Sequence, residues 1–111
     1  MTPRRRRPLE SAPARRVARD QFPALSEFLA GYLQEDFRQE HGSPAAAARA
    51  FAADADAPER QALAVDLHRF LALTEGWPLD DLRQALTTLG AAWHPASRAE
   101  VEALVTERLD Q

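Results

Sequence analysis

The sequence of 111 residues contains no cysteine, which excludes disulfide bonds, cysteine nucleophiles and cysteine–zinc sites. It has no run approaching the roughly 18 apolar residues of a membrane-spanning helix. No continuous apolar stretch follows the basic N-terminus, as a secretory signal would require. Lysine is absent as well, and all 14 basic residues are arginine. These absences favour a cytoplasmic protein, and the length of 111 residues excludes the large folds of most multi-step enzymes.

Charge divides the chain into two parts. Residues 1–19 hold seven arginines and one acidic residue, whereas residues 20–111 hold seven arginines and 16 acidic residues, a formal net charge of −9. The first part has few aliphatic side chains and cannot bury enough apolar surface to offset the entropy of ordering. We therefore predict a disordered Arg/Pro-rich tail over residues 1–20 and a folded domain over residues 21–111. The arginine run of this tail is compatible with a weak nucleic-acid contact or with a solvated leader; it comprises Arg4, Arg5, Arg6 and Arg7.

Apolar residues in the second part recur every three or four positions, which is the spacing of one helical face. No stretch alternates as a strand would, so we predict an all-α fold, a compact bundle of about five short helices. Glycines follow three of the apolar stripes, where they suit helix C-termini. The expected helices cover about residues 23–41, 44–54, 58–75, 79–89 and 98–109.

Local signals refine this expectation. Ser43 precedes a proline and is expected to cap the second helix. Ser97 and Glu100 have the spacing of a capping box for the last helix. Gly31 lies inside the first helix, where glycine favours the close approach of another helix. The loop residue Trp93 is expected in the core.

No residue pattern supports catalysis or metal binding. The histidines lack the paired spacing of metal ligands, and no serine lies in a glycine-rich elbow. Adjacent acidic residues on a helix point about 100° apart, so they do not form a shared-proton pair. Asp36 lies beside the apolar stripe of the first helix, where a charge needs a partner. We expect it either to cap a neighbouring helix or pair with an arginine, or to face a partner protein.

Several motifs occur in a characteristic order. The segment FPALSEFLAGYL over residues 22–33 is followed by Glu35-Asp36-Phe37, by Gly42-Ser43-Pro44 and by Phe51. Further along come Leu82, Leu86, Leu89-Gly90 and Trp93-His94-Pro95. Over about residues 22–95, this order resembles the immunity proteins of contact-dependent growth inhibition systems.

The resemblance implies a non-enzymatic protein without a cofactor, which binds a cognate toxin and neutralises it by occlusion. An acidic surface is compatible with this role, because it can cover a basic active site and accelerate association. The candidate toxin contacts lie at the end of the first helix, at the turn between the second and third helices, and in a later loop: Glu35, Asp36, Glu40, Asp54, Asp56, Glu59 and Trp77. The alternative is a nucleic-acid-associated or generic protein-interaction module that uses the arginine tail.

Overall fold

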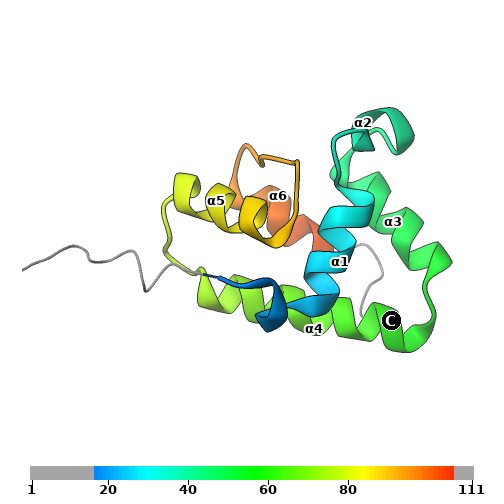
Figure 1. The fold of residues 1–111 in the computed structure, drawn as a ribbon, viewed down its shortest axis with the longest axis horizontal. Coiled ribbons are helices and arrows are strands. Elements are labelled where there is room, and N and C mark those ends of the chain that lie inside the picture. The colour runs from blue at the N-terminus through cyan, green and yellow to red at the C-terminus, as the bar shows by residue number, and fades with distance from the viewer. Residues whose placement is uncertain (1–16, 107–111) are drawn as a thin grey trace, which may run out of the picture.

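The computed structural model describes residues 17–106, and every regular element within this range is helical (Figure 1). The predicted all-α fold is therefore confirmed. Of the predicted tail over residues 1–20, residues 1–16 lie outside the described residues, and the last two residues belong to the short helix Arg19–Gln21. The elements in chain order are η2 (Arg19–Gln21), α1 (Pro23–Tyr32), α2 (Phe37–Glu40), α3 (Pro44–Asp54), α4 (Ala57–Leu73), α5 (Leu79–Leu89), α6 (Arg98–Ala103) and η3 (Leu104–Thr106).

Helix α1 is the centre of the bundle. It contacts α3, α4 and α5, and Figure 1 shows it crossing between α3 on one side and α5 on the other. Its inward face follows the helical spacing of the sequence, with Leu25, Phe28 and Leu29 buried. Trp93 is also buried, as predicted, with 2% of its surface exposed. The same apolar stripes that predict the helices thus form one continuous core.

The predicted first helix is wrong in its length, because the chain bends after Tyr32 and resumes as the short helix α2. The Leu33 carbonyl accepts a hydrogen bond from the Ala92 amide at 2.9 Å, so a distant loop takes an acceptor that a continuing helix would use. The side chain of Gln34 also accepts from the Asp36 amide at 2.6 Å. As a result, Asp36 is an exposed residue at the start of α2, and its expected place beside the apolar stripe is wrong.

Most of the predicted helix boundaries are confirmed by their local chemistry. The Ser43 hydroxyl accepts a hydrogen bond from the Ala46 amide at 3.1 Å, as expected of an N-cap. The expected box at Ser97 does not form, because Glu100 accepts from the Ala96 amide, one residue earlier. The expectation for Gly31 is also wrong: a Cβ atom there would meet nothing within 4 Å.

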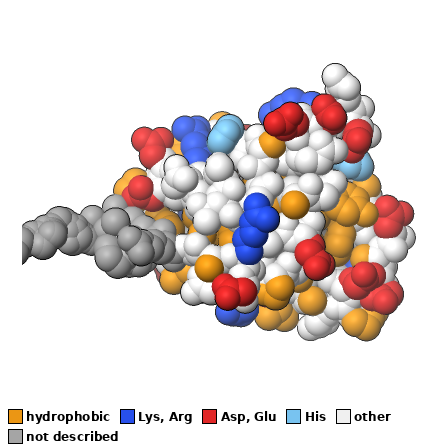
Figure 2. All heavy atoms as spheres, in the orientation of Figure 1, with side chains coloured by type: hydrophobic (Ala, Val, Ile, Leu, Met, Phe, Trp, Pro, Cys, Tyr) orange, Lys and Arg blue, Asp and Glu red, His pale blue; other side chains and the backbone are white. Residues whose placement is uncertain are grey.

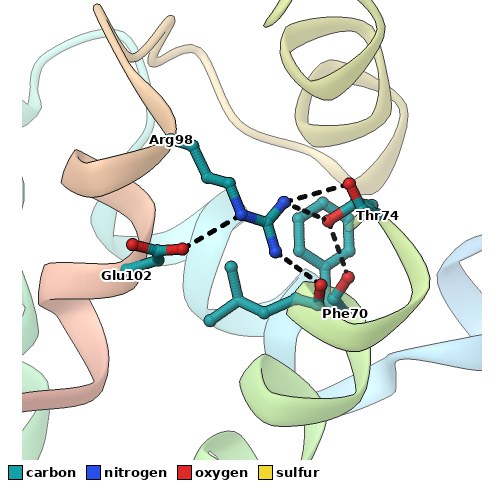
Figure 3. Close-up of polar contacts among 5 residues, drawn as sticks. Phe70, Thr74, Arg98 and Glu102 are labelled. Carbon is teal, nitrogen blue, oxygen red and sulfur yellow. Dashed lines mark hydrogen bonds and ion pairs between the residues drawn. The ribbon is translucent and has the colours of Figure 1, made fainter. Parts of the chain in front are cut away.

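Two long-range side-chain caps join the helices. From α4, Asp66 Oδ2 accepts hydrogen bonds from the amides of Ala24 and Leu25 in the first turn of α1, at 2.9 and 3.1 Å. From α6, Arg98 donates to the carbonyl groups of Leu71 and Thr74 at the end of α4, at 2.6 and 3.0 Å (Figure 3). A carboxylate at a helix N-terminus and a guanidinium at a helix C-terminus both complement the helix dipole.

Candidate functional site

A pocket of about 310 Å³ opens where α1, α3 and the beginning of α4 meet. On the side of the molecule where α3 and the start of α4 lie, Figure 2 shows hydrophobic surface flanked by acidic side chains. The residues that line the pocket are Ala24, Glu27, Phe28, Tyr32, Phe51, Asp54, Ala55, Glu59 and Ala62. We refer to this feature as the α1–α3–α4 pocket.

Aromatic rings form the apolar part of the pocket. Phe28 and Tyr32 are four residues apart on α1, so their rings stack along one helical face, with centroids 5.7 Å apart. Phe51 on α3 meets both rings edge-on, at 5.5 Å from each. On its other side, Tyr32 stacks against His41, which follows α2, at 5.7 Å. This cluster fixes the aromatic wall of the pocket before any ligand binds.

Three carboxylates, from Glu27, Asp54 and Glu59, line the same pocket, and no basic residue is among its lining residues. The Tyr32 hydroxyl donates a hydrogen bond to Asp54 Oδ2 at 3.2 Å. Glu59 Oε1 accepts from the Asp56 amide while Asp56 Oδ1 accepts from the Glu59 amide, both at 2.9 Å. This reciprocal capping box holds the Glu59 side chain in place at the start of α4. The pocket is therefore acidic and largely preformed.

The nearby base Arg60 is engaged elsewhere. Its Nη1 atom donates to the carbonyl groups of Ala55 and Ala52 at the end of α3, at 2.7 and 3.4 Å. These bonds satisfy carbonyl groups that a helix C-terminus leaves without partners. The guanidinium thus stabilises the α3–α4 turn, and it is not among the groups that line the pocket.

The surroundings of Tyr32 in the pocket change the pKa of its phenol. Burial raises the pKa of this phenol above its usual value near 10, and the hydrogen bond and negative charge of Asp54, together with the charge of Glu59, raise it further. The folded-state pKa is the higher one, so the neutral phenol stabilises the fold below pH 10. This contribution is lost as the pH rises through the folded-state pKa.

We expect the phenolate absorbance to report this effect cleanly, because Tyr32 is the one tyrosine in the chain. The native protein should titrate at a higher pH than the same protein in denaturant. The substitution Asp54→Asn should lower the pKa, although it should stay above the usual value because the burial remains. Identical titration curves for the native protein and this variant would contradict the described contact between Tyr32 and Asp54.

Of the acidic residues singled out from the sequence, the structure brings Asp54 and Glu59 together in the pocket, with Asp56 beside them as the N-cap of α4. Glu35 and Asp36 are exposed in the bend between α1 and α2. Near them, the Glu40 carboxylate accepts from Gln34 Nε2 at 2.9 Å and lies 3.8 Å from His41 Nε2. Because His41 stacks on Tyr32, this second acidic group borders the aromatic side of the pocket.

Trp77 is not brought together with these acidic residues. It lies in the loop after α4, partly buried against the core, whereas Asp56 precedes the first residue of α4. The 17 residues of α4 separate the two positions by about 25 Å, at the usual rise per residue.

Sequence reasoning missed the pocket residues Glu27, Phe28, Tyr32 and Phe51 as site residues, because the aromatic three belong to the predicted core faces. One signal was available. A tyrosine at the end of an apolar stripe must place its hydroxyl near water or a partner, so it marks the edge of a core.

In the range 17–106, no group of at least three histidine, aspartate or glutamate residues is arranged to hold a metal ion. In this same part of the chain, no helix is long and apolar enough to cross a membrane.

Comparisons with known proteins point to one family. No curated protein and no solved structure shows a significant match to this sequence. A family described as CdiI immunity protein matches residues 21–103, a range that includes every helix from α1 to α6 and the whole α1–α3–α4 pocket. The chain therefore belongs to the CdiI immunity protein family, whose members neutralise the toxins of contact-dependent growth inhibition.

Proposed function

We propose that this protein neutralises its cognate toxin in the cytoplasm by binding it directly and covering its active surface. The contact face combines the α1–α3–α4 pocket with the acidic residues at the bend before α2. The observation that carries the proposal is the pocket itself, where three carboxylates surround a fixed aromatic wall. A preformed face of this kind loses little conformational entropy on binding, which favours a tight complex.

Charge supports the same role. Residues 20–111 carry a formal net charge of −9, so the folded domain attracts a basic surface. The active surface of a toxin that acts on nucleic acid is basic, since it must bind phosphate groups. Complementary charge of this kind accelerates association and weakens with added salt. We accordingly expect the rate of complex formation to fall as the ionic strength rises.

Blocking a toxin requires no chemistry from the immunity protein itself. Members of this family are generally non-enzymatic. We propose that the protein acts stoichiometrically, so inhibition is complete when each toxin molecule has one bound partner. Turnover of a substrate by the isolated protein would contradict this account.

Titration of the purified toxin with the purified protein tests the proposal. We expect toxin activity to disappear at molar equivalence and a stable complex to form. The double substitution Glu27→Arg and Asp54→Arg should weaken binding at least tenfold, because it places two positive charges in the acidic pocket. The matched control is Asp80→Arg on α5, where the carboxylate is 94% exposed, and it should change binding less than twofold. Toxin that stays active with saturating native protein would refute direct neutralisation.

Deletion of residues 1–16 separates this function from the nucleic-acid alternative. These residues lie outside the described part of the chain and contain Arg4, Arg5, Arg6 and Arg7. If the folded domain carries the function, neutralisation should survive the deletion unchanged. A nucleic-acid module would instead show salt-sensitive nucleic-acid binding that the deletion abolishes.

A further inference from the structure

We infer that the α1–α3–α4 pocket receives one arginine side chain of the toxin, with the guanidinium packed against the aromatic wall at Phe51 and bound by the carboxylates of Glu27 and Asp54. This inference rests on the proposed direct binding of the toxin and names the group that the pocket recognises. Four observations support it: the size of the pocket, its unused acceptors, its aromatic wall, and a similar arrangement within this chain.

The size of the pocket suits one long side chain. Its volume of about 310 Å³ lies at the lower end of the range of roughly 300–1,000 Å³ for ligand pockets in proteins. Its apolar lining can cover the methylene stem of a basic side chain, while its carboxylates bind the charged end.

The carboxylates of the pocket have acceptor capacity to spare. The Tyr32 hydroxyl donates a hydrogen bond to Oδ2 of Asp54, and the Asp56 amide donates one to Oε1 of Glu59. Among the described residues, Oδ1 of Asp54 and both carboxylate oxygens of Glu27 receive no hydrogen bond or ion pair. Three negative charges near one apolar wall repel one another, and a bound cation relieves that repulsion. A bound anion would add to it, so the charge of the pocket selects a positive group.

The aromatic wall favours arginine over lysine. A guanidinium is planar and weakly hydrated, so it stacks on aromatic rings and offers paired donors to a carboxylate. An ammonium is more strongly hydrated and presents no flat face. In the pocket, the edge-to-face pair of Tyr32 and Phe51 lies beside the Asp54 carboxylate that bonds Tyr32. An aromatic surface and a carboxylate, the two groups that recognise a guanidinium, are therefore present within one site.

The chain binds its own arginine in a similar way elsewhere. The guanidinium of Arg69 lies 5.1 Å from the centroid of the Phe22 ring, and its Nη1 atom is 3.3 Å from Asp66 Oδ1. There, an aromatic ring and a carboxylate bind an arginine side chain of the same chain. In the α1–α3–α4 pocket the ring and carboxylate are present, but no arginine is among the lining residues. The toxin would supply the missing side chain.

The first experiment uses the isolated protein and a small probe. N-acetyl-arginine amide is titrated into the protein, with N-acetyl-citrulline amide as the neutral probe of nearly the same shape. We expect the arginine probe to shift the nuclear magnetic resonance signals of Tyr32 and Phe51, and to lower the pKa of the Tyr32 phenol, since a nearby cation favours the phenolate. Citrulline should bind at least tenfold more weakly. Equal binding of the two probes would overturn the inference.

The second experiment uses the toxin. Asp54→Asn and Tyr32→Ala should each weaken toxin binding about tenfold, with Asp80→Asn as the matched control that leaves it unchanged. Each toxin arginine is then replaced by alanine in turn. One of these replacements should weaken binding to the native protein but not to Asp54→Asn, as expected when the two side chains are in direct contact. Tyr32→Phe, which keeps the ring of the aromatic wall, should retain most of the affinity, and circular dichroism of each variant checks that it is folded.

The outcomes separate the two proposals. If native protein binds and inhibits the toxin but Asp54→Asn weakens binding less than twofold, direct neutralisation stands and the arginine inference fails. Coupling of Asp54 to an uncharged toxin residue, with none to an arginine, would overturn the inference as well. If native protein does not bind the toxin at all, the proposed function itself fails.

Discussion

Replacing Asp66 with alanine is expected to lower the free energy of unfolding by about 3 kcal/mol. Asp66 is buried, with 6% of its surface exposed, and its carboxylate accepts hydrogen bonds from the first-turn amides of Ala24 and Leu25. The residue at the N-cap position of α1 is Phe22, whose side chain has no acceptor. Alanine at position 66 would therefore leave the buried amide of Leu25 and the partly buried amide of Ala24 without this partner, at the helix end where negative charge is most stabilising.

Urea unfolding followed by circular dichroism measures this effect. The control is Asp80→Ala, whose exposed carboxylate lies 3.6 Å from Arg83 and should contribute less than about 0.5 kcal/mol. Asp66→Asn should fall between the two, because the amide oxygen still accepts a hydrogen bond but carries no charge. If Asp66→Ala lowers the free energy of unfolding no more than the control does, water must satisfy the α1 amides as well as the carboxylate does.

The position of Asp66 also matters for the pocket. Helix α1 carries Phe28 and Tyr32, which form part of the aromatic wall, and the cap fixes where this helix begins relative to α4. We therefore expect toxin binding to weaken in Asp66→Ala even under conditions where the variant remains folded. The same contact thus contributes to the stability of the bundle and to the geometry of its candidate binding face.

The helices of this protein are predictable from the sequence because their causes are local. The spacing of Leu25, Phe28 and Leu29 defines a helical face by itself, and Ser43 caps its helix with an amide only three residues away. Glycines at 42, 76 and 90 adopt the positive φ angles that end helices, at 90°, 81° and 124°. Each of these features depends on a few neighbouring residues, so no knowledge of tertiary structure is needed.

The features that sequence reasoning missed depend on residues far apart in the chain. The break after Tyr32 uses the amide of Ala92, and the cap of α1 uses Asp66, which lies more than 40 residues further along the chain. The α1–α3–α4 pocket is similar. Asp54 and Glu59 were predicted as contacts from their charge, but the aromatic wall that they face exists only once α1 packs against α3 and α4. Local periodicity assigns those aromatic residues to the core without showing that they also reach its edge.

The second large effect is expected at Arg98. Replacement with alanine should lower the free energy of unfolding by about 2 kcal/mol, because charged hydrogen bonds that close the end of α4 are lost. The Arg98 guanidinium donates hydrogen bonds to the carbonyl groups of Leu71 and Thr74, to the Thr74 hydroxyl at 3.1 Å and to the Glu102 carboxylate at 3.0 Å. Figure 3 shows this guanidinium between Thr74 and Glu102. Thr74 is fully buried, so its groups need partners from the protein.

Arg98→Lys should recover less than half of this loss, since an ammonium cannot reproduce the planar fork that reaches Leu71 and Thr74 together. Arg38→Ala is the control, because the exposed Arg38 guanidinium lies over the Phe37 ring at 4.9 Å, a contact expected to contribute about 0.5 kcal/mol. The Arg98 bonds close the end of α4 opposite the α1–α3–α4 pocket. Under conditions where Arg98→Ala is folded, toxin binding should therefore match that of the native protein, in contrast to Asp66→Ala. A parallel loss of binding in both variants would show that the two ends of α4 are coupled.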